Sequence, residues 1–358
     1  MNRSNKIDIM KAIGIILVVI GHCTNIIFLH RFIYLFHLAL FFVISGYLYN
    51  EKYADNPWNY IGKILKSYIP LYFIYNTIFV LGHNLFIQIG ILDNSLPIYG
   101  YPETVCSLLN SFLFISNEPF SAAMWFIPVL IVSLIIFNFI TNYSSKTKIL
   151  QRKELLRFSL VFLITIIGIY LNYKNLNIGL HYQTSFAIMP FIYLGHCIKL
   201  YGSKILKSNI KLAALLIILI IIIIYKIPGQ VELSQNCLWK PHLFYILSPL
   251  MIYVIFTIST YINKHNHILT NLLSYIGKNT ISIMCLHILF FKLFDFVYIN
   301  LITHEYDKIG MFTCSYQDIW IIYSIIGITG PLLTNYIAQK IIQKSKFKIK
   351  NFINSKSK

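Results

Sequence analysis

Long apolar segments recur along almost the whole chain, and they constrain the fold more than any other feature of the sequence. Each segment approaches the roughly 20 residues that an α-helix needs to cross the hydrocarbon core of a bilayer. Of the 358 residues, 57% are hydrophobic and 12% are charged, about half the charged share of an ordinary soluble domain. We therefore expect an all-α fold, a polytopic bundle of membrane helices in a single domain that covers residues 1–358.

Hydropathy, turn residues and charged breaks divide the chain into about ten predicted spans. Because this number is even, both ends of the chain lie on the same side of the membrane. Of the 30 Lys and Arg residues, 24 fall on that side, in the terminal segments and alternate loops with their flanking span ends. By the positive-inside rule, both termini are cytoplasmic. The approximate span limits are 8–28, 31–49, 69–91, 124–142, 158–173, 183–200, 210–227, 242–262, 279–302 and 318–340.

The formal net charge of +18 follows from the same distribution. It indicates membrane topology and contact with anionic lipid rather than nucleic-acid binding. Residues 341–358 form a basic cytoplasmic tail in this interpretation. No paired spacing of the six cysteines and no HExxH motif indicates a metal site, so we expect none. No GxSxG nucleophile elbow is present either, which favours direct group transfer over a covalent serine intermediate and leaves a transient covalent histidine open.

Ionisable side chains concentrate in the first predicted span, where their cost within a membrane marks them as functional candidates. Lys11 and His22 are eleven residues apart, close to three helical turns, so they share one helix face about 16 Å apart along the axis. This distance is comparable with the extended pantetheine arm of coenzyme A. Lys11 could therefore hold CoA phosphates while His22 meets the thioester. Asp8 lies three residues before Lys11 and can orient its ammonium group.

The second predicted span returns along the first after a turn expected at residues 29–30. His37 then lies at nearly the depth of His22. One imidazole can act as general base toward an acceptor hydroxyl, and the other can position or protonate a reacting group. A histidine in a helix also serves packing or interhelical hydrogen bonds, so this structural alternative stays open.

Ser45 and Gly46 fall back to the level of Lys11 near the cytoplasmic side. Gly46 would permit a close backbone approach to bound CoA. The alternative for Lys11 is a membrane anchor, since a lysine at the inner end of a span commonly extends its ammonium to the interface.

At these residues the sequence resembles the acyltransferase-3 family of membrane acyltransferases, and within it the fucose 4-O-acetylase-like branch. The family signature, a basic residue and a histidine with ten residues between them, is present as Lys11-x10-His22. Residues 36–48, FHLALFFVISGYL, are similar to the family pattern F-H-x-P-L-F-F-x-x-S-G. Ala39 stands where proline is common, and Lys11 replaces the arginine of many members, which removes the bidentate fork.

The resemblance implies a ten-helix bundle that transfers an acyl group, commonly acetyl, from cytoplasmic acyl-CoA. The acceptor would be a hydroxyl of a cell-surface polysaccharide, O-antigen or lipid-linked sugar. Acetyl-CoA or another acyl-CoA is then a donor substrate, and no cofactor is bound permanently. The resemblance assigns CoA handling to Lys11 and catalysis to His22, with His37, Ser45 and Gly46 as further motif members. It also implies a multi-pass protein of a bacterial inner membrane.

Polar residues outside the first two spans give weaker signals. Glu118 and Trp125, at the outer end of the fourth span, could hold a sugar, although Trp125 also suits an interfacial aromatic belt. In the ninth span Lys292 and Asp295 are spaced for a helical ion pair, and His287 before them is interpreted as structural. We expect the remaining histidines with no partner at informative spacing, at positions 83, 181 and 196, to be packing or loop residues.

The alternative function is a transporter or flippase for a lipid-linked sugar, since ten spans with sparse intramembrane charge suit that class as well. A flippase would more typically spread its charged residues over several central helices. Here they concentrate on one hairpin at a CoA-length spacing, which favours the acyltransferase. A third hypothesis, a purely structural partner in a polysaccharide synthase, does not explain the polar residues of the first two predicted spans.

Overall fold

The computed structural model of the protein describes residues 5–115, 118–147, 149–174, 176, 181–205 and 207–356, with the backbone alone for 203–205 and 345–356. Within this part the fold is all-α apart from one two-stranded hairpin, as the apolar segments predict. The helices are α1 (Asn5–Cys23), α2 (Ile27–Tyr34), α3 (His37–Leu48), α4 (Pro57–Gln88), α5 (Tyr101–Phe112), α6 (Phe126–Ser145), α7 (Leu150–Tyr173), α8 (Tyr182–Ala187), α9 (Met189–Ile205), α10 (Ile210–Lys226), α11 (Pro241–His265), α12 (His267–Lys278), α13 (Thr280–Tyr298) and α14 (Trp320–Lys356), and the strands are β1 (Val231–Glu232) and β2 (Cys237–Leu238).

Seven helical segments in the described part of the chain are long and apolar enough to cross a membrane. The three other predicted spans correspond to α1, to α8 with α9, and to α10. Three charged residues, Lys6, Asp8 and Lys11, interrupt α1, while α9 and α10 have 17 residues each. The count of ten spans and the cytoplasmic position of both termini therefore stay predictions. The seven segments are Ile27–Leu48, Pro57–Gln88, Phe126–Ser145, Leu150–Tyr173, Pro241–His265, Thr280–Thr303 and Gln317–Lys344.

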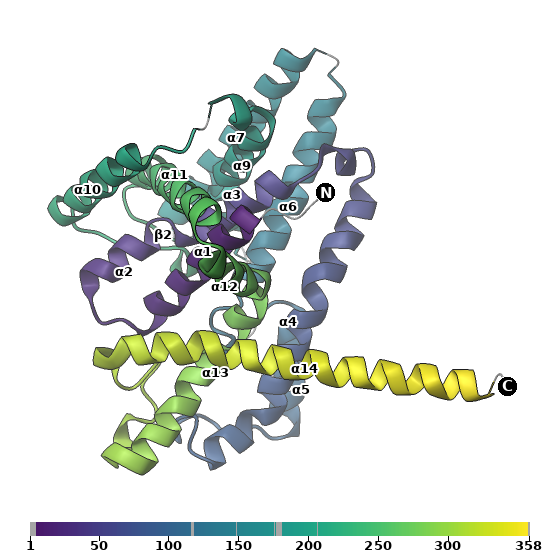
Figure 1. Ribbon diagram of the computed structural model, residues 1–358, viewed down its shortest axis with the longest axis vertical. Helices are drawn as coiled ribbons and strands as arrows, with labels where there is room; N and C mark the ends of the chain where they lie inside the picture. The colour runs from purple at the N-terminus through teal and green to yellow at the C-terminus, as the bar shows by residue number, and fades with distance from the viewer. Residues whose placement is uncertain are drawn as a thin grey trace.

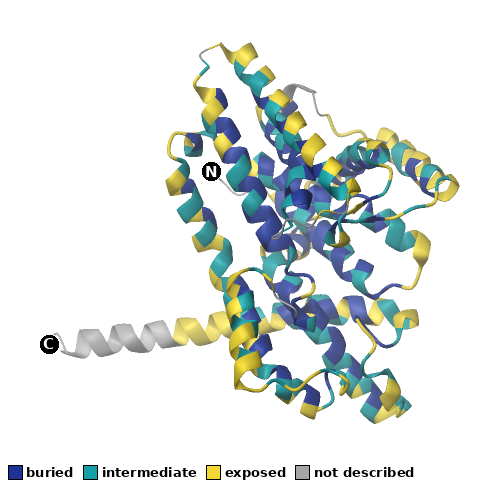
Figure 2. Ribbon diagram, turned by 180° about the vertical axis from the view of Figure 1, so that it is seen from behind, coloured by how far each residue is buried: buried dark blue, intermediate teal, exposed yellow. Residues whose placement is uncertain are grey.

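Helix α1 lies in the centre of the bundle. It packs against α3, α11, α12, α13 and α14, and Figure 1 shows it among α3, α11 and α12. The contact with α12 is made backbone to backbone, because a Cβ added at Gly277 would lie only 1.8 Å from the carbonyl oxygen of Asp8. Buried residues gather in this central region in Figure 2. Neighbouring helices thus shield the polar side chains of α1 from lipid, where they would be costly.

The turn between the first two spans lies earlier than the sequence suggests. Helix α1 ends at Cys23, and the hydroxyl of Thr24 accepts a hydrogen bond of 3.2 Å from the backbone N–H of Ile26. The turn predicted at residues 29–30 is therefore wrong, since both residues lie inside α2. A short break at Leu35 and Phe36 then separates α2 from α3.

Helices α3 and α9 make the most extensive helix–helix contact in the described structure. A Cβ added at Gly46 would lie 1.9 Å from the carbonyl oxygen of Ile192, and one added at Gly195 would lie 1.9 Å from that of Val43. Small residues at such positions let two membrane helices approach until their backbones touch. Gly46 therefore packs α3 against α9.

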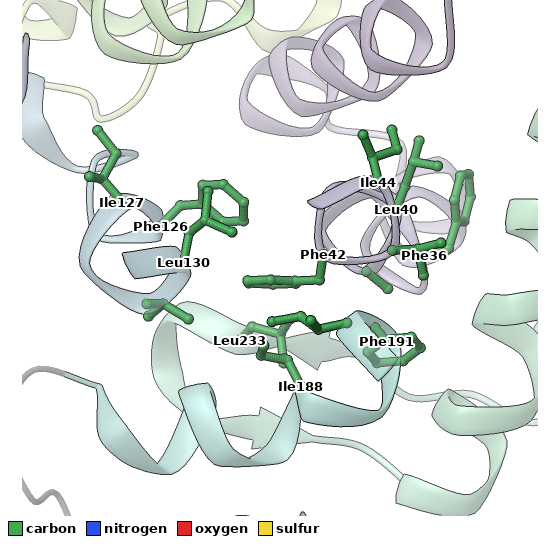
Figure 3. Packing of buried hydrophobic residues seen from close by; sticks show 14 of the residues in the cluster. Phe36, Leu40, Phe42, Ile44, Phe126, Ile127, Leu130, Ile188, Phe191 and Leu233 are labelled. Carbon is green, nitrogen blue, oxygen red and sulfur yellow. The ribbon is translucent and has the colours of Figure 1, made fainter. Parts of the chain in front are cut away.

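The core between α3, α6 and the strand hairpin fixes the position of α3 from its other sides. The ring centroids of Phe42 and Phe126 lie 5.1 Å apart. In Figure 3 Phe42 lies between Leu130 of α6 and a layer that includes Ile188 and Leu233. All these side chains belong to one buried cluster, so α3 is held by apolar packing as well as by its contact with α9.

Candidate active site

A cavity of about 430 Å³ lies between α1, α3, α6 and α13. The segment between α3 and α4, the first part of α4 and the β1–β2 hairpin complete its walls. Five of the residues singled out in the sequence line it together: Lys11, His22, His37, Ser45 and Trp125.

The wall contributed by α1 has the geometry that the sequence spacing predicts. Lys11, Ile15, Val18 and His22 all line the cavity, and their steps of four, three and four residues keep them on one helix face. The cavity therefore extends about 16 Å along α1. The shared face of Lys11 and His22 is confirmed, while their chemical roles stay predictions.

A second imidazole lies beside His22. The ring centroids of His22 and His287 are 5.1 Å apart, and His287 is fully buried. Its Nδ1 is 2.9 Å from the carbonyl oxygen of Ile283. Because a carbonyl oxygen only accepts, Nδ1 carries the proton and Nε2 carries the lone pair. Within the described residues this buried Nε2 has no hydrogen-bond partner. The sequence assigned His287 no place in the site.

His37 has the same hydrogen-bond arrangement on the opposite side of the cavity. Its Nδ1 donates to the carbonyl oxygen of Ile33 at 2.8 Å, so Nε2 is the basic nitrogen. The ring of Tyr34, which also lines the cavity, lies 4.8 Å from the His37 ring. A neutral imidazole in this tautomer can accept a hydrogen bond from a bound hydroxyl through Nε2.

A second cation besides Lys11 lines the cavity. Lys63 lines the cavity, and its ammonium donates a hydrogen bond to the hydroxyl of Tyr53 and lies 4.3 Å from the centre of the Tyr53 ring. The sequence indicated Lys63 only as an inner-loop charge, since it lies far from Lys11 in the chain. Ser45 donates its hydroxyl proton to the carbonyl oxygen of Phe41 at 2.8 Å.

The three other predicted site residues, Asp8, Gly46 and Glu118, are not among those that line the cavity. Asp8 is buried where α1 meets α12, and Gly46 lies at the α3–α9 contact. Glu118 is buried and 3.1 Å from Nδ1 of His83. His83, expected to be a packing or loop residue, is buried in α4 and has this carboxylate as a partner that its sequence spacing did not indicate. The binding roles predicted for Asp8, Gly46 and Glu118 stay predictions.

The hairpin between α10 and α11 contributes Glu232, Ser234 and Gln235 to the cavity wall. Its strand β1 packs against α2, which follows the His22 end of α1, so the hairpin lies toward that end of α1 rather than toward Lys11. Burial raises the pKa of the Glu232 carboxyl above its ordinary value, while hydrogen bonds from Ser234 oppose this shift. No sequence motif indicated these residues, because the hairpin lies in a short loop far from the first two spans.

A network of charged side chains includes Glu51, which lies between the cavity-lining residues Tyr49 and Tyr53 in the chain. Nη1 of Arg157 is 2.8 Å from Glu51 Oε1, from Glu154 Oε1 and from His196 Nε2. These three groups are close enough to one another to hold a metal ion, but the guanidinium already lies among them. The hydrogen bond with His196 is the largest cause that lowers the pKa of Glu51, and Lys153 and Arg157 add to it against the effect of burial.

His196, expected to be a packing or loop residue because no partner lies at an informative sequence spacing, is buried and belongs to this network. In one tautomer its Nε2 accepts from Arg157, and in the other it donates to Glu51, at 3.0 Å. The interpretation of Lys292 and Asp295 as an ion pair is confirmed by a distance of 3.1 Å between Nζ and Oδ2.

Comparison with known proteins gives one match. The family model described as an acyltransferase domain, that of the acyltransferase-3 family, matches residues 4–336. No curated protein and no solved structure matches the chain. Because the matched region spans nearly the whole sequence and includes α1, α3 and α13 with their cavity, the chain belongs to the acyltransferase-3 family of membrane acyltransferases.

Proposed function

We propose that the protein is an O-acetyltransferase that moves an acetyl group from cytoplasmic acetyl-CoA to a hydroxyl of a cell-surface or lipid-linked sugar. The observation that carries the proposal is the set of groups that line one cavity. The ammonium groups of Lys11 and Lys63, the imidazoles of His22 and His37, and the side chains of Trp125 and Glu232 all line it. A bacterial inner membrane as the location is part of the same proposal.

The donor end has the charge that CoA requires. Two ammonium groups can bind the phosphates of CoA as point charges. If the termini are cytoplasmic, Lys11 and Lys63 face the compartment that contains acyl-CoA. The pantetheine arm then follows the face of α1 past Ile15 and Val18, both of which line the cavity, and brings the thioester to His22.

The chemistry proposed at His22 is general base catalysis of direct acyl transfer. The imidazole accepts the proton of the acceptor hydroxyl while the oxygen attacks the thioester carbonyl. A C–O bond forms and the C–S bond breaks, and the proton then passes from His22 to the CoA sulfur. His37 offers its Nε2 as a second acceptor that can orient the sugar hydroxyl. Nε2 of His287, which lies beside the His22 ring, can accept its N–H and orient that imidazole.

The test compares purified wild type with His22→Ala in proteoliposomes that contain radiolabelled acetyl-CoA and lipid-linked oligosaccharide. We expect His22→Ala to lower the transfer rate by about 10²- to 10⁴-fold, the usual contribution of a general base. His267→Ala is the matched control, because His267 is exposed at the start of α12 and should transfer at the wild-type rate.

Equal transfer by wild type and His22→Ala would exclude the assignment of His22. No transfer by wild type from acetyl, propionyl or succinyl donors would instead favour a transporter for a lipid-linked sugar. The donor site has its own test, since Lys11→Gln and Lys63→Gln should raise the KM for acetyl-CoA. The same two variants should leave the KM for the sugar unchanged.

A further inference from the structure

The β1–β2 hairpin is a built part of the cavity wall. Val231 pairs with Leu238 and Glu232 pairs with Cys237 in antiparallel register. The side chains of Val231, Leu233 and Leu238 are buried in the core, which anchors the hairpin from below. This anchoring fixes the positions of Glu232, Ser234 and Gln235, which line the cavity.

A contact with α8 holds the tip of this hairpin. The hydroxyl of Thr184 lies 2.6 Å from the amide oxygen of Asn236 and 3.3 Å from the carbonyl oxygen of Leu233. Thr184 is itself buried. The cavity-lining residues of the hairpin are therefore held in place by their buried neighbours in the hairpin and by Thr184 of α8.

Glu232 brings to this wall a carboxylate that has no cation beside it. None of the ion pairs in the described part of the chain includes it. Its hydrogen bonds there come from the backbone N–H and the hydroxyl of Ser234, and both reach Oε1. The second carboxylate oxygen thus remains available to a bound molecule. Burial also raises the pKa of Glu232, which indicates that the group gains from additional hydrogen-bond donors.

The position of Glu232 relates it to the imidazoles. Glu232 lies on β1, which packs against α2, the helix that ends at Tyr34, and the Tyr34 ring lies 4.8 Å from His37. Tyr34 also approaches α1 closely, because a Cβ added at Gly21 would lie 2.8 Å from its ring. The ring of Tyr34 therefore connects a molecule bound at Glu232 with the imidazoles of the proposed reaction.

We propose that this hairpin is the acceptor subsite, and that Glu232 binds neighbouring hydroxyls of an uncharged sugar; this inference rests on the proposed function. A carboxylate accepts two hydroxyl donors with charge-assisted hydrogen bonds. Ser234 and Gln235 can both donate and accept, and the Trp125 ring offers an apolar face to the C–H groups of a pyranose. An acidic sugar meets like charge at Glu232 and is rejected.

The experiment uses the purified full-length protein, methyl fucoside and methyl glucoside as neutral probes, and methyl glucuronide as the anionic probe. Binding is measured by saturation-transfer NMR and transfer by radiolabelled acetyl-CoA. We expect Glu232→Gln to weaken neutral-sugar binding and raise the sugar KM by about 10- to 100-fold, the range for a lost hydrogen bond to a charged group. The same variant should lower the preference for neutral over anionic sugar by at least about tenfold.

The control is Glu103→Gln, since Glu103 is exposed on α5 and distant from the cavity lining. It should leave both measurements unchanged, and Glu232→Gln should keep the wild-type KM for acetyl-CoA and the wild-type melting temperature. An unchanged sugar KM with an unchanged charge preference in Glu232→Gln would overturn the subsite.

Failure of the proposed function gives a different result. In that case wild type transfers no acyl group, and the binding measurement decides the subsite alone. Saturable binding of a neutral probe that weakens in Glu232→Gln supports the subsite even then. Absence of saturable binding to both neutral probes in wild type overturns it.

Discussion

Gly46→Ala is expected to force α3 away from α9. The added Cβ would lie 1.9 Å from the carbonyl oxygen of Ile192, and real Cβ atoms essentially never come within 3.0 Å of such an atom. Because the obstacle is backbone, a rotamer change cannot relieve it, and the two helices must separate by about 1 Å. Overpacking of this kind costs about 1–3 kcal/mol, against a gain in helix propensity of up to about 1 kcal/mol from Gly to Ala.

The measurement is thermal unfolding of the purified protein in detergent. We expect Gly46→Ala to lower the apparent melting temperature by several degrees. Gly195→Ala should do the same, since its Cβ would lie 1.9 Å from the carbonyl oxygen of Val43. The two substitutions open the same gap, so the double variant should cost less free energy of unfolding than the sum of the single variants.

Gly62→Ala is the matched control because a Cβ at this position of α4 meets nothing within 4 Å. It should melt at the wild-type temperature or slightly above it. If Gly46→Ala melts with wild type while Gly62→Ala behaves as expected, the backbone contact between α3 and α9 is refuted. Activity provides a second measurement, since a shift of about 1 Å near reacting groups can cost about 10²-fold in rate.

Three further predictions concern the charged network and the outer loops. Arg157→Met should lower the free energy of unfolding by about 2 kcal/mol, since it removes a fully buried guanidinium and its hydrogen bonds to the partly exposed carboxylates of Glu51 and Glu154, whereas Lys153→Met should cost less than about 1 kcal/mol; melting temperatures that fall equally would contradict this. The pKa of Glu51 is lowered in the folded protein, so its stabilisation is present above pH 4.5 and is lost as the pH falls toward the lowered value. Glu51→Gln should therefore melt lower at pH 7 and lose less stability on acidification. Cys106 and Cys237, exposed on loops predicted to lie outside, should react with an impermeant maleimide in intact cells; labelling only after permeabilisation would reverse the topology.

Local periodicity explains the parts of the structure that the sequence could predict. Lys11 and His22 belong to one helix, so their spacing alone determines a shared face. The same holds for Lys292 and Asp295, three residues apart and paired in the structure. Apolar runs likewise predict the all-α fold, because membrane-spanning backbone must satisfy its own hydrogen bonds.

The rest depends on contacts between distant segments, for which periodicity gives no signal. Lys63 reaches the cavity from α4, and Glu232 reaches it from a two-stranded hairpin. Arg157 gathers Glu51 and His196 from segments more than 100 residues and nearly 40 residues away. Each of these residues, taken alone in the sequence, is typical of a loop charge or a packing histidine.

The apolar residues that line the cavity also affect whether ions can leak across the membrane. In the proposed orientation the Lys11 end faces the cytoplasm and the Glu232 end faces the outside, so a wet passage between them would leak ions. Ile15, Val18 and Phe41 lie along the lining, and hydrophobic constrictions of this kind resist water and hydrated ions. An uncharged acyl group meets no such barrier. In the proposed function, fixed apolar side chains would thus block ion flow and preserve the membrane potential. The acyl group would then reach the far side of the membrane without a domain motion.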